Sequence, residues 1–333
     1  MEKLRVAGVQ IEHKAGDKDY NLGSIEYYTR KAAAEGVSVI AFPECCISSY
    51  MYLAGLDRGE LVDLADEVPG SGTVEMLCRL AASEKITIMA GLLEKEKSVE
   101  GEYELFNTYV SVSADGSIVK YRKLHPFVNE HLRPGGEFKF WEIEGWKASC
   151  LICYDCNIPE NWRVLQLNGA QVVFCPHQTG GFDVPCAGMG KISQELWRNR
   201  YTAPGPVRSE ILGPKGREWV GKWLPGRAYD FGTYVVFCNG VGIDGDEVRT
   251  GNSMILDPHG IILAETNALG DDMVIADLDP AKLGNNLGRS HAVARRPELY
   301  RPLTEHKAEQ IDTREERTRL RRELGAELTD IQE

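Results

Sequence analysis

Hydrophobic residues recur along this chain in short continuous runs, and longer stretches with helical spacing lie between them. The runs at 4–10, 37–42 and 86–93 have the length and composition of buried strands. Between the first two runs, apolar positions fall on one face of a helix predicted over 20–36. A second helix is predicted to begin near Ser71, an N-cap residue type, and to end near Lys85. This alternation is typical of an α/β protein.

A turn signal and a second set of runs extend the pattern. Asp115-Gly116 separates two strand-like runs and predicts a β-hairpin. Further strands are predicted at 147–153, 172–175, 233–239, 253–256, 261–265 and 273–278, with a helix at 159–168. Two similar halves predict two mixed sheets covered by helices, forming one domain over residues 1–302.

The last part of the chain has a different composition. Residues 303–333 are dense in Glu and Arg, with Leu320, Leu324, Leu328 and Ile331 at near-helical spacing. We expect a charged helical C-terminal tail there. It is either a solvated helix or an arm that lays an apolar stripe on a partner subunit.

Composition narrows the class of protein. Hydrophobic residues make up 43% of the 333 residues, and the formal net charge is −12. An acidic surface repels phosphate backbones and anionic lipids, which argues against nucleic-acid and membrane partners. No apolar run reaches the length of a membrane span, and the N-terminus lacks a secretory pattern. Nine cysteines are too few for a disulfide scaffold, so we expect free thiols in the cytoplasm.

Three reactive residues each follow a predicted strand. Glu44 comes after the run at 37–42 and Pro43, and Lys123 follows the second strand of the hairpin. Cys153 ends an apolar strand and precedes a helix, a corner that exposes a nucleophile. A carboxylate can take the proton of a thiol, and an ammonium can stabilise the anion that forms when the thiol attacks a carbonyl or a nitrile.

These segments resemble the signature of the nitrilase superfamily, the carbon–nitrogen hydrolases. Pro43-Glu44, Tyr121-Arg122-Lys123 and Cys153-Tyr154-Asp155 match it in order, and the resemblance extends to about residue 302. It implies a Glu–Lys–Cys triad, a four-layer α-β-β-α sandwich and assembly into homodimers or larger homo-oligomers. It also implies a second glutamate near the triad. Glu130 stands in that position, shortly before a Pro-Gly, and is expected to position the substrate or tune Lys123.

Departures from the superfamily pattern bear on the substrate. Tyr154-Asp155 resembles the amidase and carbamoylase branches, because true nitrilases usually have Trp-Glu after the cysteine. Cys156 and Asn157 replace the paired arginines that hold the carboxylate in carbamoyl-D-amino-acid hydrolases. We therefore predict hydrolysis of a small amide or N-carbamoyl compound through a thioester acyl-enzyme, with release of ammonia. The residues expected to contact this substrate are Tyr50, Tyr154, Asn157 and His177.

The stretch from 177 to 226 is long for this place in the pattern and carries Phe182, Trp197, Tyr201, Trp219 and Trp223. It is expected to form a lid over the pocket or an oligomer contact.

Two further patterns in the sequence suggest other kinds of site. Cys150, Cys153 and Cys156 suggest a metal site, but residues three apart on a strand point to opposite faces. The glycines at 240–245 fit a dinucleotide pattern, yet residues 246–251 are predicted to be a loop rather than a helix. We expect neither metal nor cofactor. A nitrilase, a Cys–His mechanism, acyl transfer and a non-catalytic scaffold of the same fold remain alternatives.

Overall fold

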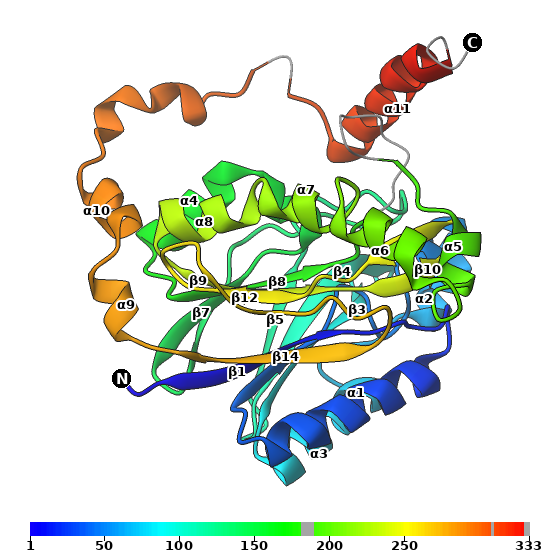
Figure 1. Cartoon of the computed structure of the whole chain (residues 1–333), viewed down its shortest axis with the longest axis horizontal. Coiled ribbons are helices and arrows are strands. Elements are labelled where there is room, and N and C mark those ends of the chain that lie inside the picture. Colours follow the sequence, from blue (N-terminus) through cyan, green and yellow to red (C-terminus); the bar gives the residue numbers. More distant parts are fainter. Residues whose placement is uncertain (181–189, 308–309, 330–333) are drawn as a thin grey trace.

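The computed structural model describes residues 1–180, 190–307 and 310–329. Two six-stranded sheets are stacked face to face, and helices cover the outer face of each (Figure 1). This confirms the predicted four-layer sandwich with two mixed sheets. Within the described ranges, no helix is both long and apolar enough to cross a bilayer.

The first sheet has the strand order β14-β1-β2-β3-β4-β5. Its centre is parallel, since β2 pairs in parallel with both β1 and β3. The other pairs are antiparallel, including the hairpin of β4 and β5 that Asp115-Gly116 predicted. The strands are β1 (Leu4–Gln10), β2 (Val39–Ala41), β3 (Thr87–Lys97), β4 (Tyr103–Val112), β5 (Ile118–Arg122) and β14 (Asp272–Leu278).

The second sheet repeats this arrangement, with the order β13-β12-β9-β8-β7-β6. Here β8 pairs in parallel with β7 and β9, and antiparallel strands flank them. The strands are β6 (Phe140–Ile143), β7 (Trp146–Cys150), β8 (Val172–His177), β9 (Tyr234–Asn239), β12 (Met254–Leu256) and β13 (Ile262–Glu265). A separate hairpin is formed by β10 (Val241–Asp244) and β11 (Glu247–Thr250).

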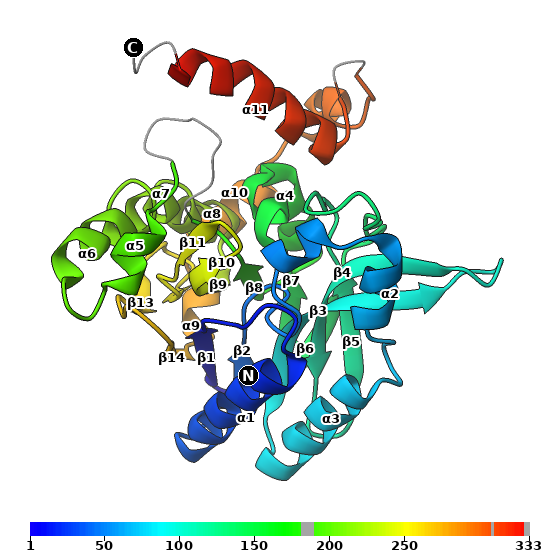
Figure 2. The ribbon, with the colours of Figure 1, turned by 90° about the vertical axis from the view of Figure 1, so that its right-hand side faces the viewer.

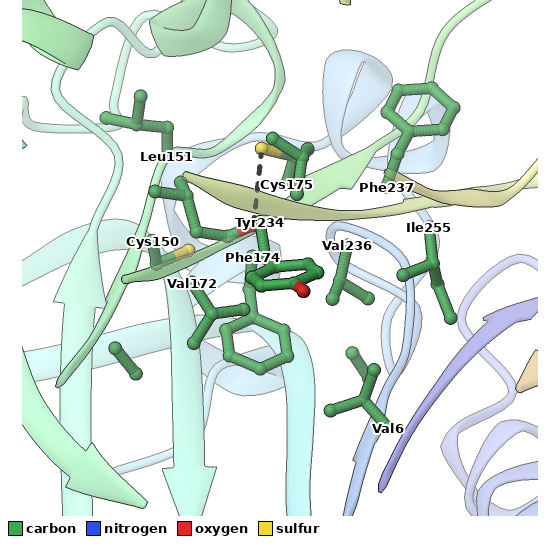
Figure 3. Close-up of a cluster of buried hydrophobic side chains, with 14 of the residues drawn as sticks. Val6, Cys150, Leu151, Val172, Phe174, Cys175, Tyr234, Val236, Phe237 and Ile255 are labelled. Carbon is green, nitrogen blue, oxygen red and sulfur yellow. Dashed lines mark hydrogen bonds between the residues drawn. The ribbon is translucent and has the colours of Figure 1, made fainter. Parts of the chain in front are cut away.

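The main core lies between the sheets. Val6 of β1 and Val236 of β9 belong to one cluster of buried side chains, part of which Figure 3 shows. A second cluster joins the outer face of the first sheet to α1 (Lys18–Ala34) and α3 (Gly72–Glu84). On the other side, Trp162 and Phe231 from α4 (Pro159–Leu167) and α8 (Leu224–Phe231) stack with their ring centroids 6.1 Å apart.

The remaining helices are short, apart from the last. They are η1 (Met51–Gly55), α2 (Arg58–Leu64), η2 (Cys153–Asn157), α5 (Gln194–Arg198), α6 (Pro204–Leu212), α7 (Arg217–Gly221), α9 (Ala281–Gly284), α10 (Leu287–Val293), η3 (Pro297–Leu299), η4 (Arg301–Leu303) and α11 (Thr313–Thr329). In both views α11 lies outside the four layers, beyond the helices that cover the second sheet (Figures 1 and 2).

Two sequence-based boundaries were wrong. The strand predicted over 147–153 ends at Cys150, because the chain leaves the sheet and turns into η2. The loop predicted over 246–251 contains β11, which pairs with β10 across a tight turn at Gly245. Of the aromatic residues singled out between 177 and 226, Phe182 lies outside the described residues.

Candidate active site

The structure brings the three predicted reactive residues together at the ends of strands from both sheets. Glu44 follows β2, Lys123 follows β5, and Cys153 is the first residue of η2 after β7. The Lys123 Nζ atom lies 2.6 Å from the Glu44 Oε1 atom. Cys153 adjoins this pair, since the charges of both residues act on its thiol.

Glu44 and Lys123 form a buried ion pair. Their exposed fractions are 0% and 1%. Asn107 of β4 donates from Nδ2 to the same Glu44 oxygen at 2.7 Å, and its carbonyl accepts the Lys123 backbone N–H at 2.8 Å. The other carboxylate oxygen of Glu44 has no hydrogen-bond partner among the described residues. A buried carboxylate with one unused oxygen has the capacity to accept a proton from a neighbouring group.

Cys153 stands at a strained corner. Its φ is +48°, in the left-handed region that non-glycine residues rarely adopt. The Asp155 carboxylate holds this corner against the segment after Lys123. It accepts hydrogen bonds from the backbone N–H groups of Ile152, Leu124 and His125, and from the hydroxyl of Tyr121. Asp155 therefore fixes the position of the cysteine relative to the lysine.

The electrostatic surroundings keep the thiol protonated. Burial raises the pKa of Cys153 to about 12, and the negative charge of Glu44 adds to the rise. The positive charge of Lys123 and a hydrogen bond from the Gln178 backbone oppose it. Burial lowers the pKa of Lys123, but the Glu44 carboxylate, together with smaller contributions from Tyr50, Cys153 and Asp155, outweighs this, so that pKa is raised well above its usual value. The resting site thus holds a neutral thiol beside a charged ion pair.

Cys153 opens onto a cavity of about 290 Å³. All four residues predicted to contact substrate line this cavity, namely Tyr50, Tyr154, Asn157 and His177, and so does Glu130. Glu44 and Lys123 are not among the lining residues and lie deeper. The structure therefore brings every predicted site residue to one place. Cys153, Glu130 and the four contact residues line the cavity, and Glu44 and Lys123 lie behind them.

The predicted contact residues differ in character. His177 is 1% exposed, and neither ring nitrogen has a hydrogen-bond partner among the described residues. The Tyr50 ring lies under the ammonium of Lys123, 5.3 Å from Nζ to the ring centroid. Tyr154 is half-buried, whereas Asn157 and Glu130 are exposed at the mouth.

Sequence reasoning missed several residues of the site. Asn107 gave no signal, because an asparagine within a strand is not distinctive. Phe127, Gln178 and Trp219 also line the cavity. Trp219 comes from the 177–226 segment, so this segment contributes directly to the pocket wall. β11 and α11 supply further residues that were not foreseen, namely Glu247, Arg249, Arg314, Arg317 and Thr318. Met51, Ala54, Val128, Asn129 and Thr179 complete the lining.

The glycine pattern at 240–245 has a structural role. The glycines at 240–245 belong to the β10–β11 hairpin rather than to a helix N-terminus. No group of three or more metal-binding side chains occurs in the part of the chain that the structure describes.

The fold and the sequence together define the class of protein to which this chain belongs. Residues 5–285 match the carbon–nitrogen hydrolase family, and the chain belongs to it. This confirms the resemblance to the nitrilase superfamily on which the site was first identified.

Individual relatives carry different activities in their names. The chain is 29% identical over 282 residues to the 2-oxoglutaramate amidase of Bacillus subtilis, covering 83% of this chain and 91% of that one. It is also 29% identical over 225 residues to a nitrilase of Pyrococcus abyssi, covering 66% and 80%. Among solved structures, an amidase of the nitrilase superfamily from Nesterenkonia superposes with a TM-score of 0.66 at 21% identity, over 91% of this chain and 97% of that one. This last similarity is one of fold.

Proposed function

We propose that this carbon–nitrogen hydrolase cleaves small amides or N-carbamoyl compounds with Cys153 as nucleophile, Glu44 as general base and Lys123 as the stabilising cation. One observation carries the proposal. The half-buried thiol of Cys153 faces the cavity from a strained corner, and the Glu44–Lys123 ion pair lies directly behind it. The names of the amidase relatives support the choice of substrate class.

The chemistry begins with the protonated thiol. Glu44 accepts its proton as the sulfur attacks the carbonyl carbon, forming a C–S bond and a tetrahedral oxyanion. The Lys123 ammonium and the backbone N–H of Tyr154 stabilise that charge. When the intermediate collapses, the C–N bond breaks and Glu44 returns the proton to the leaving nitrogen. Ammonia leaves, and a thioester remains on Cys153.

The second half restores the enzyme. A water molecule attacks the thioester while Glu44 again takes a proton, and the C–S bond breaks to release the acid and the thiol. Glu130 at the mouth of the cavity is placed to orient the substrate or this water. A buried, permanently charged Lys123 suits the role of an electrostatic stabiliser better than that of a proton donor.

The test is ammonia release from a panel of aliphatic amides, ureido acids and nitriles. Cys153→Ala and Glu44→Gln should each lower kcat by at least about a thousandfold, since both remove a group that acts on the reacting atoms. His177→Ala should retain far more activity than either, because its ring takes no part in the proton transfers. Circular dichroism would establish that each variant is folded.

Three results would count against the proposal. Ammonia release from nitriles alone would assign the chain to the nitrilase branch. Loss of activity in His125→Ala, His131→Ala or His177→Ala with full activity in Glu44→Gln would indicate a Cys–His mechanism. A folded wild-type protein whose Cys153 resists every electrophile would favour a non-catalytic scaffold.

A further inference from the structure

The start of helix α11 (Thr313–Thr329) is fastened to the segment that carries Lys123 and Glu130. The Thr313 hydroxyl lies 3.3 Å from Nδ1 of His125. Arg314 donates from Nη1 to the carbonyl of Glu130 at 2.8 Å. This helix follows the part of the chain that matches the family, which ends at residue 285. It is therefore a feature of this chain that the family match does not cover.

The start of α11 also forms part of the wall of the catalytic cavity. Arg314, Arg317 and Thr318 line it together with Cys153. The Arg317 guanidinium lies 4.8 Å from the centroid of the Phe127 ring, and that ring packs edge-on against Tyr154 at 5.6 Å. Arginine stacks readily on aromatic rings, which holds its planar group in a defined orientation. In Figure 2, α11 runs across the outside of the molecule.

The charges that line the cavity favour an anionic group. Three of the lining residues are arginines and two are glutamates, in a protein of net charge −12. Arg249 is committed to the fold, with its Nε atom 3.0 Å from Asp244 and its Nη1 atom 2.6 Å from Glu247. This pairing also neutralises Glu247. Two further acids lie nearby: Glu130, at the mouth, and Asp312, paired with Arg314 at 3.1 Å.

Arg314 keeps capacity for a ligand despite these contacts. A guanidinium carries five N–H donors. The hydrogen bonds of Arg314 to Asp312, Glu130 and Leu132 use its Nε and Nη1 atoms. Planar guanidinium groups bind carboxylates through paired, charge-assisted hydrogen bonds. Beside the nucleophile, by contrast, Asn157 supplies no charge where a carboxylate clamp would stand.

We propose that Arg314 and Arg317 determine specificity, selecting amides that carry a carboxylate at the end remote from the scissile bond. The inner shell of Cys153, Glu44 and Lys123 acts on the amide, and the outer wall of α11 receives the carboxylate. The substrate class is then the monoamide of a dicarboxylic acid or a compound of that kind. This inference rests on the proposed function of the same cavity.

The experiment compares three amides of similar length: glutaramate, its methyl ester and 5-aminopentanamide. The wild-type protein should have its highest kcat/KM for glutaramate. Arg317→Gln and Arg314→Gln should each raise the ratio of KM for glutaramate to KM for the ester by about tenfold, the usual effect of losing one charge-assisted hydrogen bond. The kcat values should change much less than KM, because the arginines do not touch the reacting atoms. Arg322→Gln, an exposed arginine on the same helix, is the matched control and should leave the ratio at its wild-type value.

The inference is overturned if the wild type prefers the ester or the amine, or if Arg322→Gln shifts the ratio as much as Arg317→Gln does. Calorimetric binding of glutaramate to the Cys153→Ala protein separates this result from the proposed function. If glutaramate binds there in an Arg317-dependent way and the wild type hydrolyses no amide, the anion site stands and the proposed reaction fails. If hydrolysis proceeds without preference for glutaramate, the reaction stands and the anion site fails.

Discussion

Cys153 is surrounded by groups that disfavour its ionisation. Burial and the Glu44 carboxylate raise its pKa to about 12, and Lys123 only partly compensates. A thiol in this setting is a poor nucleophile until a base removes its proton, so the proposed reaction depends on Glu44 at the moment of attack. The ion pair with Lys123 keeps that carboxylate next to the thiol without leaving it as an isolated buried charge.

The protonation state of Cys153 can be tested directly. Because its pKa is raised, the thiol stays protonated from about pH 7 to 9 and ionises only as the pH approaches 12. The ultraviolet absorbance of the thiolate, taken as the difference between the wild type and Cys153→Ser, should therefore show no step near neutral pH. Glu44→Gln removes a negative charge and should move the step to lower pH. A thiolate step near neutral pH in the wild type would contradict this assignment.

At the level of elements, the site depends on a close approach between the Glu44 loop and β3. A Cβ atom added at Gly91 would lie 2.2 Å from the backbone nitrogen of Cys45 and 2.8 Å from the carbonyl oxygen of Pro43. The carbonyl of Gly91 also accepts the backbone N–H of Ile47 at 3.2 Å. Gly91 thus lets the loop pack on the strand and sets the depth of Glu44. Gly135 allows a similar close approach beside Lys123, because a Cβ atom added at Gly135 would lie 2.2 Å from the carbonyl oxygen of Arg122.

Gly91→Ala should damage both stability and catalysis. The overlap is with backbone atoms, so the loop must shift, at a cost of about 1–3 kcal/mol in the free energy of unfolding. A shift of about 1 Å in Glu44 should lower kcat by roughly a hundredfold. Urea unfolding and ammonia release measure the two effects.

The control for this variant is Gly23→Ala, at an exposed position of α1 where a Cβ would meet nothing within 4 Å. It should stabilise the protein by about 0.5–1 kcal/mol, because alanine favours a helix. An active and stable Gly91→Ala protein would show that the loop tolerates displacement.

At the scale of the whole molecule, the segment between β14 of the first sheet and α11 leaves apolar side chains in water. Val293 is 89% exposed, Leu303 62% and Leu299 57%. Figure 1 shows this segment arching away from the layered body. A second copy of the chain is the occupant that we expect to cover it, in line with the homo-oligomer predicted from the superfamily resemblance.

Sedimentation of two matched variants tests this expectation. Val293→Asp should raise the dissociation constant of the oligomer by at least about tenfold, since it places a charge in an apolar contact. Val99→Asp, at the fully exposed tip of the β3–β4 hairpin, should sediment as the wild type does. A wild-type protein that is monomeric at all concentrations would refute the assembly.

Much of the secondary structure could be predicted from local sequence patterns. Continuous apolar runs identified the central parallel strands of both sheets, because such strands are covered on both faces. Asp115-Gly116 predicted the β4–β5 hairpin, and Ser71 caps α3 as its residue type suggests. The boundary near Cys153 was wrong because the apolar run continues past the last paired residue, Cys150. Only the pairing with β8 shows where the sheet ends.

The sequence alone determined the layered α/β class and the family resemblance and predicted the three candidate reactive residues, because these depend on residue type, order and short-range periodicity. It could not show that Asn107 and Asp155 fix the lysine and the cysteine, nor that α11 borders the cavity. Those facts arise from contacts between segments far apart in the chain, such as Arg314 on the carbonyl of Glu130. Hydrophobic patterning specifies which face of an element is buried, whereas the partners across a cavity are settled only when the sheets and the C-terminal helix pack together.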